Sequence, residues 1–142
     1  MSQAALDRFK AAVQHVEQKH DTGPLVKLFG PDSTLDSPAH EQPLRGVAGA
    51  EAFWGEYLDA FQDMKSTFTN EQLAGDTAIL EWSSKGTLPT GRAVTYRGVS
   101  LVTFAGDRIK RFVTYYDSAQ FVSDANVPMT VETGWKNDDG GD

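Results

Sequence analysis

Cysteine is absent from this chain of 142 residues. Its absence excludes disulfide bonds, thiolate metal ligands and a cysteine nucleophile. Long apolar runs are also missing: none approaches the roughly 18 residues of a membrane-spanning helix, and the polar N-terminal residues lack the apolar segment of a signal peptide. We therefore expect a cytoplasmic protein that makes no contact with a membrane.

Positive charge and histidine are scarce. The chain has 13 Lys and Arg residues against 20 Asp and Glu residues, a formal net charge of −7, whereas binding to nucleic acid requires clustered basic residues. The three histidines are His15, His20 and His40, and their spacing with acidic residues predicts no metal site. No glycine-rich phosphate loop or Gly-x-Ser-x-Gly motif is found. We expect no nucleic-acid partner, no metal and no cofactor.

The composition that remains is typical of a single folded domain. Hydrophobic residues make up 39% of the chain and aromatic residues 11%, which is enough for a core. The last stretch differs, because residues 124–142 carry five acidic residues against the single Lys136. We predict a folded domain over residues 1–123 and an acidic, flexible tail over residues 124–142.

Two amphipathic patterns predict helices. Apolar residues recur every three or four positions from Ser2 to His20, and again from Val47 to about Asp63, where aromatic residues crowd one face. Between them, the sequence predicts a short helix or turn over Leu25 to Phe29, a short strand over Thr34 to Asp36 and a proline-containing loop over Pro38 to Gly46.

Four strand-like runs follow the helices, at about residues 64–73, 77–88, 94–104 and 108–117, separated by turns that contain glycine. Helices followed by a meander of strands predict an α+β fold, in which N-terminal helices pack on a curved antiparallel β-sheet.

The last two runs predict a long β-hairpin that ends in a carboxylate. With strict alternation, Ile109, Tyr115 and Asp117 share one face, so that an acid closes a largely apolar row. Burial there would favour the protonated acid and suit Asp117 to exchange protons near neutral pH. In the alternative interpretation, Arg97 or Arg111 pairs with Asp117 in a structural ion pair.

Other side chains with a ring or a hydroxyl group are expected to line the interior. Strand alternation predicts that Trp82 faces inward on one strand, and Tyr96 and Ser100 on the next. Such groups can donate hydrogen bonds to an oxyanion, although each can equally be a core residue whose polar tip is satisfied. The candidates are Trp54, Tyr57, Trp82, Tyr96, Ser100 and Tyr115.

Several short motifs occur in a characteristic order: Leu-Asp-Ser-Pro at residues 35–38, Pro-Leu-Arg-Gly at residues 43–46, an aromatic helix, and Tyr-Tyr-Asp at residues 115–117. In this order they resemble the SnoaL-like polyketide cyclase family of the NTF2-like superfamily, over residues 3–122. The resemblance implies a cystatin-like α+β cone with a pocket between the sheet and its helices, and a homodimer that pairs through the sheets.

The resemblance also implies candidate site residues. Asp117 matches the general acid/base of the cyclases, which close a ring by an intramolecular aldol reaction without a cofactor. His40 lies in the loop that approaches the pocket mouth in this family, where it would meet a ligand or remain solvated. A histidine from the sheet commonly assists the acid, but this chain has no histidine after residue 40.

Three functions remain open on the sequence. The first is a cofactor-free cyclase or isomerase that acts on a hydrophobic, carbonyl-containing small molecule through Asp117. The second is a pocket that binds such a molecule without chemistry, which the missing sheet histidine favours. The third is a dimeric interaction module whose pocket is filled by its own aromatic side chains.

Overall fold

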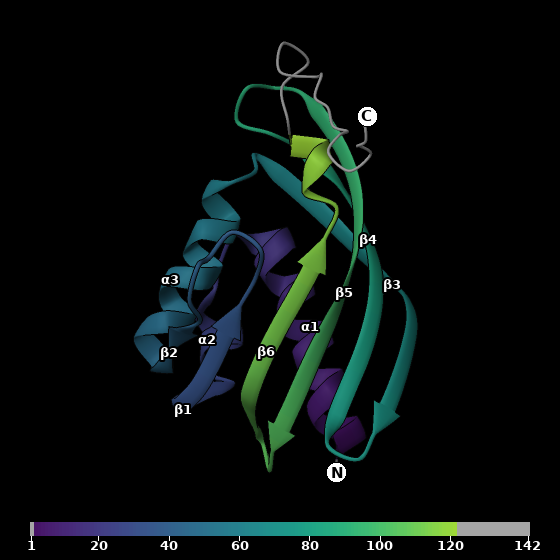
Figure 1. The fold of residues 1–142 in the computed structure, drawn as a ribbon. Helices are drawn as coiled ribbons and strands as arrows, with labels where there is room; N and C mark the ends of the chain where they lie inside the picture. Colours follow the sequence, from purple (N-terminus) through teal and green to yellow (C-terminus); the bar gives the residue numbers. More distant parts are fainter. Residues whose placement is uncertain (1, 122–142) are drawn as a thin grey trace, which may run out of the picture.

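The computed structural model describes residues 2–121, with three helices, six strands and a terminal 3-10 turn among them (Figure 1). The predicted tail over residues 124–142 lies outside the described residues. The bounds are α1 (Ser2–Lys19), α2 (Gly23–Val26), β1 (Phe29–Asp36), β2 (Leu44–Arg45), α3 (Gly46–Asp59), β3 (Asp63–Ala74), β4 (Thr77–Thr87), β5 (Ala93–Ala105), β6 (Arg108–Tyr116) and η1 (Ser118–Phe121).

The strands form one curved sheet in the order β2-β1-β6-β5-β4-β3. Strands β3 to β6 form the expected antiparallel meander, but β1 pairs with β6 in parallel, so the sheet is mixed. The predicted curved antiparallel sheet is confirmed for β3 to β6, and the parallel pair of β1 and β6 is a feature that the sequence did not predict. A parallel pair joins strands that lie far apart in the chain, so no turn motif in the local sequence predicts it.

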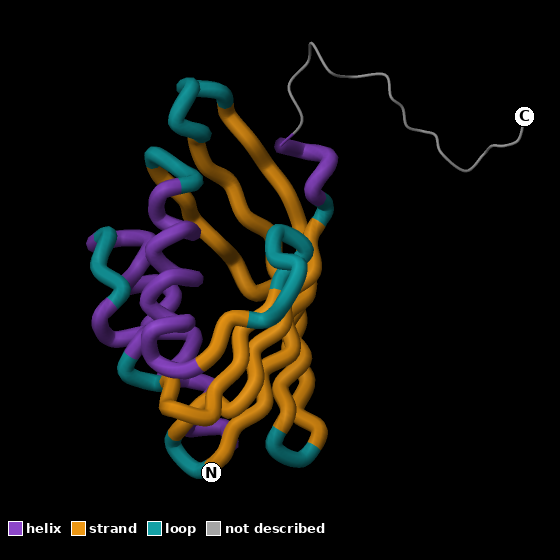
Figure 2. Tube along the Cα trace, turned by 60° about the vertical axis from the view of Figure 1, so that its left-hand side comes forward, coloured by secondary structure: helices purple, strands orange, loops and turns teal. Residues whose placement is uncertain are grey.

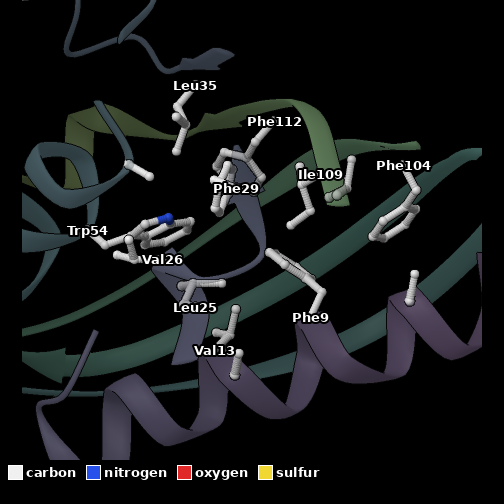
Figure 3. Close-up of a cluster of buried hydrophobic side chains, with 14 of the residues drawn as sticks. Phe9, Val13, Leu25, Val26, Phe29, Leu35, Trp54, Phe104, Ile109 and Phe112 are labelled. Carbon is white, nitrogen blue, oxygen red and sulfur yellow. The ribbon is translucent and has the colours of Figure 1, made fainter. Parts of the chain in front are cut away.

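The helices cover the concave face of the sheet (Figure 2). The apolar stripe of α1 packs onto the strands, where Leu6 and Val16 are fully buried and the ring centroids of Phe9 and Phe112 are 5.9 Å apart. Figure 3 shows Phe9 and Val13 pointing from α1 into this core. None of the helices within residues 2–121 is long and apolar enough to cross a membrane.

An irregularity in β6 changes which side chains face inward. Phe104 of β5 pairs with Ile109, but the neighbouring Thr103 pairs with Arg111, so one extra residue is accommodated between the two pairs. Such a bulge shifts the alternation of the strand by one position. Beyond it, Phe112 is buried whereas Tyr115 is 53% exposed. The predicted row from Ile109 to Asp117 is therefore wrong, because strict alternation is broken.

Candidate functional site

A cavity of about 370 Å³ lies between the helices and the inner face of the sheet. Its wall is built by α1, the loop after β1, α3 with the two residues that follow it, strands β3 to β6, and η1. Three exposed residues of the wall, Ala39, Glu56 and Ala60, mark its open side. The volume falls within the range of sites that hold small organic ligands.

A carboxylate from α1 lies in this wall. Glu17 is only 9% exposed, and three donors converge on it. The Tyr57 hydroxyl donates to Oε2 over 2.7 Å, and Ser66 donates from its backbone N–H to Oε1 over 2.8 Å and from its hydroxyl to Oε2 over 2.6 Å. Ser84 continues the cluster, with its Oγ 2.6 Å from Oγ of Ser66. This donor set suits an ionised carboxylate, which is a pure acceptor.

The hydrogen bonds of Glu17 come from neutral groups alone. Among residues 2–121, Glu17 forms no ion pair with Lys, Arg or His. Burial raises the pKa of Tyr57 well above its ordinary value, and the negative charge of Glu17 raises it further. The pKa of Tyr96 is also raised, by burial first and then by Tyr116 and Glu17. Both phenols are therefore protonated donors at neutral pH.

A second polar cluster lies on the sheet wall. Nε1 of Trp82 donates to Oγ of Ser100 over 2.9 Å, and Ser100 lies 2.8 Å from Oγ1 of Thr114. The indole can occupy this place because residue 98 is glycine: a side-chain carbon there would overlap both the Trp82 ring and the Tyr115 carbonyl. Trp82 and Ser100 thus line the cavity with their polar atoms already paired.

His40 joins the loop after β1 to α3 at the open side of the cavity. Its Nδ1 lies 3.0 Å from Oγ of Ser37, and its Nε2 lies 2.9 Å from Oε1 of Glu56. The imidazole stacks on Phe53, with ring centroids 5.5 Å apart. Because the ring is held on both nitrogens, His40 fastens the loop to the helix beside the cavity.

Aromatic rings make up much of the remaining wall. Tyr96 contacts Trp82, Phe61 and Phe121, with ring centroids 5.3, 6.0 and 4.8 Å away. Trp54 and Tyr57 of α3 also line the cavity, as the helix pattern predicts. Within the described part of the chain, the buried Nε1 of Trp54 has no hydrogen-bond partner.

Asp117 lies outside this wall. It is exposed, its backbone N–H donates to the Arg97 carbonyl over 3.2 Å, and its Oδ1 accepts the backbone N–H of Ala119 over 3.1 Å. It thereby caps η1, and in residues 2–121 neither Arg97 nor Arg111 forms an ion pair with it. The catalytic role of Asp117 stays a prediction.

The bulge in β6 also decides which neighbouring tyrosine contacts the cavity. Tyr116 lines the wall, whereas Tyr115 lies on the outer face of the sheet. Burial raises the pKa of Tyr116, and the nearby Ser37 hydroxyl opposes this effect. The sequence interpretation named Tyr115, because it assumed unbroken alternation from Ile109.

Sequence reasoning missed the acid that does lie in the cavity. Glu17 follows Val13 by four residues, which places it on the apolar stripe of α1, and this position was the available signal. It also missed Ser66, because its partner in α1 is distant in sequence. No group of three His, Asp or Glu side chains within residues 2–121 is placed to hold a metal ion.

Comparison with known proteins adds a family to this geometry. The SnoaL-like domain family matches residues 8–112. An NTF2-like protein from Anabaena variabilis ATCC 29413 superposes with a TM-score of 0.77, at 15% identity over 84% of this chain and 91% of that chain. None of the curated proteins matches the chain.

Two further solved structures contain small molecules. A protein with a ketosteroid isomerase-like fold from Catenulispora acidiphila DSM 44928, in complex with trimethylamine, gives a TM-score of 0.70 at 18% identity over 79% of this chain and 87% of that chain. TerC, co-crystallised with polyporic acid, gives 0.71 at 17% identity over 84% and 94%. With the family match over residues 8–112 and an NTF2-like fold, the chain belongs to the SnoaL-like family.

Proposed function

We propose that the protein binds a largely apolar small molecule of about bicyclic size in the cavity between its helices and its sheet. The observation that carries this proposal is a cavity of about 370 Å³ with aromatic walls and the carboxylate of Glu17 among them. Such a site would hold the ring system by apolar contact and orient it through a few polar groups. The trimethylamine and polyporic acid complexes of similarly folded proteins support a small-molecule site.

The test blocks the open side of the cavity. Ala60 is exposed and belongs to the wall, whereas Ala48 of α3 is exposed and does not belong to the wall. We expect wild-type protein and Ala48→Trp to bind 2-naphthol alike in calorimetric titrations. Ala60→Trp should weaken binding by about tenfold or more, because the indole would occupy the entrance. Equal affinity in Ala60→Trp would contradict the proposal.

A second candidate function is cofactor-free cyclisation or isomerisation of a carbonyl compound. Family membership and the buried acid Glu17 favour it. In this reaction a carboxylate takes a proton from the carbon next to a carbonyl, the electron pair moves onto the carbonyl oxygen, and a donor stabilises the enolate. Glu17 would accept the proton, and the Tyr57 hydroxyl, no longer needed by a neutral Glu17, would turn to donate to the enolate oxygen. The enolate carbon is then reprotonated, or it attacks a second carbonyl of the same molecule.

An experiment with a model ketone can distinguish whether Glu17 or Asp117 acts as the base. Exchange of the protons next to the carbonyl of 2-tetralone for deuterium can be followed by NMR in heavy water. A positioned carboxylate should accelerate it by about a hundredfold or more, Glu17→Gln should abolish the acceleration, and Asp117→Asn should retain it. Loss in Asp117→Asn with retention in Glu17→Gln would assign the chemistry to Asp117. Binding without acceleration would leave the binding function alone.

A further inference from the structure

We propose that the cavity prefers a cation: an amine with an apolar body, bound as its ammonium form beside Glu17. This inference rests on the proposed binding function and names the ligand class of the same site. It starts from the charges of the cavity wall. Glu17 and Glu56 contribute carboxylates, of which Glu56 is paired with His40, while no Lys or Arg belongs to the wall among the described residues.

Glu17 itself provides the second step. A charge that is removed from water is expensive unless an opposite charge accompanies it. Glu17 is 9% exposed, accepts its hydrogen bonds from Tyr57 and Ser66, and has no cationic partner within residues 2–121. A bound ammonium group would supply the missing opposite charge, whereas a bound carboxylate would add a second negative charge.

The field of this carboxylate extends beyond its direct hydrogen bonds. The charge of Glu17 contributes to the raised pKa values of Tyr57 and Tyr96, which lie on opposite walls of the cavity, in α3 and β5. A group that disfavours the phenolate anion on both walls disfavours other anions in the space between them. The same field favours a cation.

The aromatic residues beside Glu17 suit the rest of such a ligand. Ser66 pairs with Ser84 across β3 and β4, and Ser84 pairs with Tyr96 of β5, so the Glu17 cluster leads directly to Tyr96. Trp82, Phe61 and Phe121 surround the Tyr96 ring. The faces of aromatic rings attract ammonium groups, most strongly where water is excluded. The site therefore combines one anionic group with rings that can take both the charge and the apolar body.

The first test compares two ligands of the same shape and different charge. Phenyltrimethylammonium and tert-butylbenzene differ by a positively charged nitrogen in place of a carbon. We expect wild-type protein to bind phenyltrimethylammonium about tenfold or more tightly than tert-butylbenzene, as measured by competition with 2-naphthol. Equal or tighter binding of tert-butylbenzene would overturn the ammonium preference and leave the binding function intact. Failure of all three compounds to bind would instead remove the binding function.

The second test assigns the preference to Glu17. Glu17→Gln should weaken phenyltrimethylammonium binding about tenfold and leave tert-butylbenzene binding unchanged. Glu51→Gln is the matched control, because Glu51 is exposed on α3, lies outside the cavity wall and changes the net charge equally. An equal loss in both variants would show a general charge effect and overturn the assignment. The wild-type comparison needs no variant and stands even if Glu17→Gln fails to fold.

Discussion

Tyr57 of α3 donates a hydrogen bond of 2.7 Å to Oε2 of Glu17 in α1, and so joins two helices at the wall of the cavity. The donor is a phenol whose pKa is raised by burial and by the charge of Glu17 itself. The hydrogen bond therefore stabilises the protonated form of the phenol that donates it, because the neighbouring negative charge disfavours loss of the phenol proton. It holds the acid in place while leaving it within the cavity wall.

Removal of this donor is the first prediction. Tyr57→Phe leaves Glu17 with the two donors of Ser66 and keeps the ring. We expect the free energy of unfolding to fall by about 1–3 kcal/mol, the cost of depriving a buried charged group of a partner. Urea denaturation followed by circular dichroism measures it. Tyr115→Phe is the control, because Tyr115 is 53% exposed and should change stability by less than about 0.5 kcal/mol. Equal effects of the two substitutions would contradict the assigned contact.

The buried tyrosines predict an alkaline limit to stability. The pKa values of Tyr57, Tyr96 and Tyr116 are raised in the folded protein, above the value of about 10 for an unfolded chain. Above that pH the unfolded state releases protons that the folded state retains, so the free energy of unfolding falls as the pH rises. Below it, these groups contribute no slope.

The measurement is a series of urea titrations between about pH 8 and about pH 11. For each tyrosine that titrates only when unfolded, the slope approaches about −1.4 kcal/mol per pH unit. Tyr96→Phe should remove one such contribution and give a shallower decline than the wild type. An unchanged slope in Tyr96→Phe would contradict the raised pKa of Tyr96.

The place of Trp82 depends on the glycine opposite it. At residue 98 a side-chain carbon would overlap the Trp82 ring and the Tyr115 carbonyl, whereas at Gly55 in α3 nothing lies within 4 Å. We expect Gly98→Ala to destabilise the protein by about 1–3 kcal/mol and to displace the indole into the cavity. Gly55→Ala should instead stabilise it by about 0.5–1 kcal/mol, as alanine does in a helix. Thermal melts compare the two, and tryptophan fluorescence reports the indole. Similar melting temperatures for the two variants would contradict the predicted overlap at residue 98.

Much of the fold follows from local patterns in the sequence. The stripe of α1 and the four strands of the meander repeat with a fixed period, so their existence and approximate bounds could be predicted. The parallel pairing of β1 with β6 could not, because its partners lie far apart in the chain. The residues of the candidate site depend on the register of β6, which a bulge shifts by one residue. One extra residue between Ile109 and Arg111 exchanged Tyr115 for Tyr116 in the cavity wall.

The acidic residue of the cavity shows a second limit of what the sequence can predict. The sequence places Asp117 at the end of the last strand; in the structure Asp117 directly follows β6, and its side chain caps η1. The position of Glu17 on the apolar stripe of α1 indicates that it is buried, but it does not indicate that Tyr57 and Ser66 donate hydrogen bonds to it. Partners from α3 and β3 have no local signature in α1. A buried carboxylate of this kind becomes recognisable once tertiary contacts are known.

The expected homodimer leads to the last prediction. On the outer face of the sheet, Ile79 of β4 pairs with the half-buried Leu101 of β5, which pairs with Val113 of β6, a residue already buried within the monomer. Ile79 is 37% exposed and Tyr115 lies beside this row at 53% exposure. We propose that a second copy covers Ile79, Leu101 and Tyr115, because apolar side chains at the centre of a sheet face are common in dimer interfaces.

Leu101→Glu tests this proposal, because it places a charge in the middle of the row. Light scattering coupled to size-exclusion chromatography should give a dimer for the wild type and a monomer with retained circular dichroism for Leu101→Glu, since a buried unpaired charge opposes association. Ala48→Glu adds the same charge at an exposed position of α3 and should remain dimeric. A monomeric wild type at micromolar concentration would rule out the sheet-mediated dimer. A dimer that persists in Leu101→Glu would place the interface elsewhere.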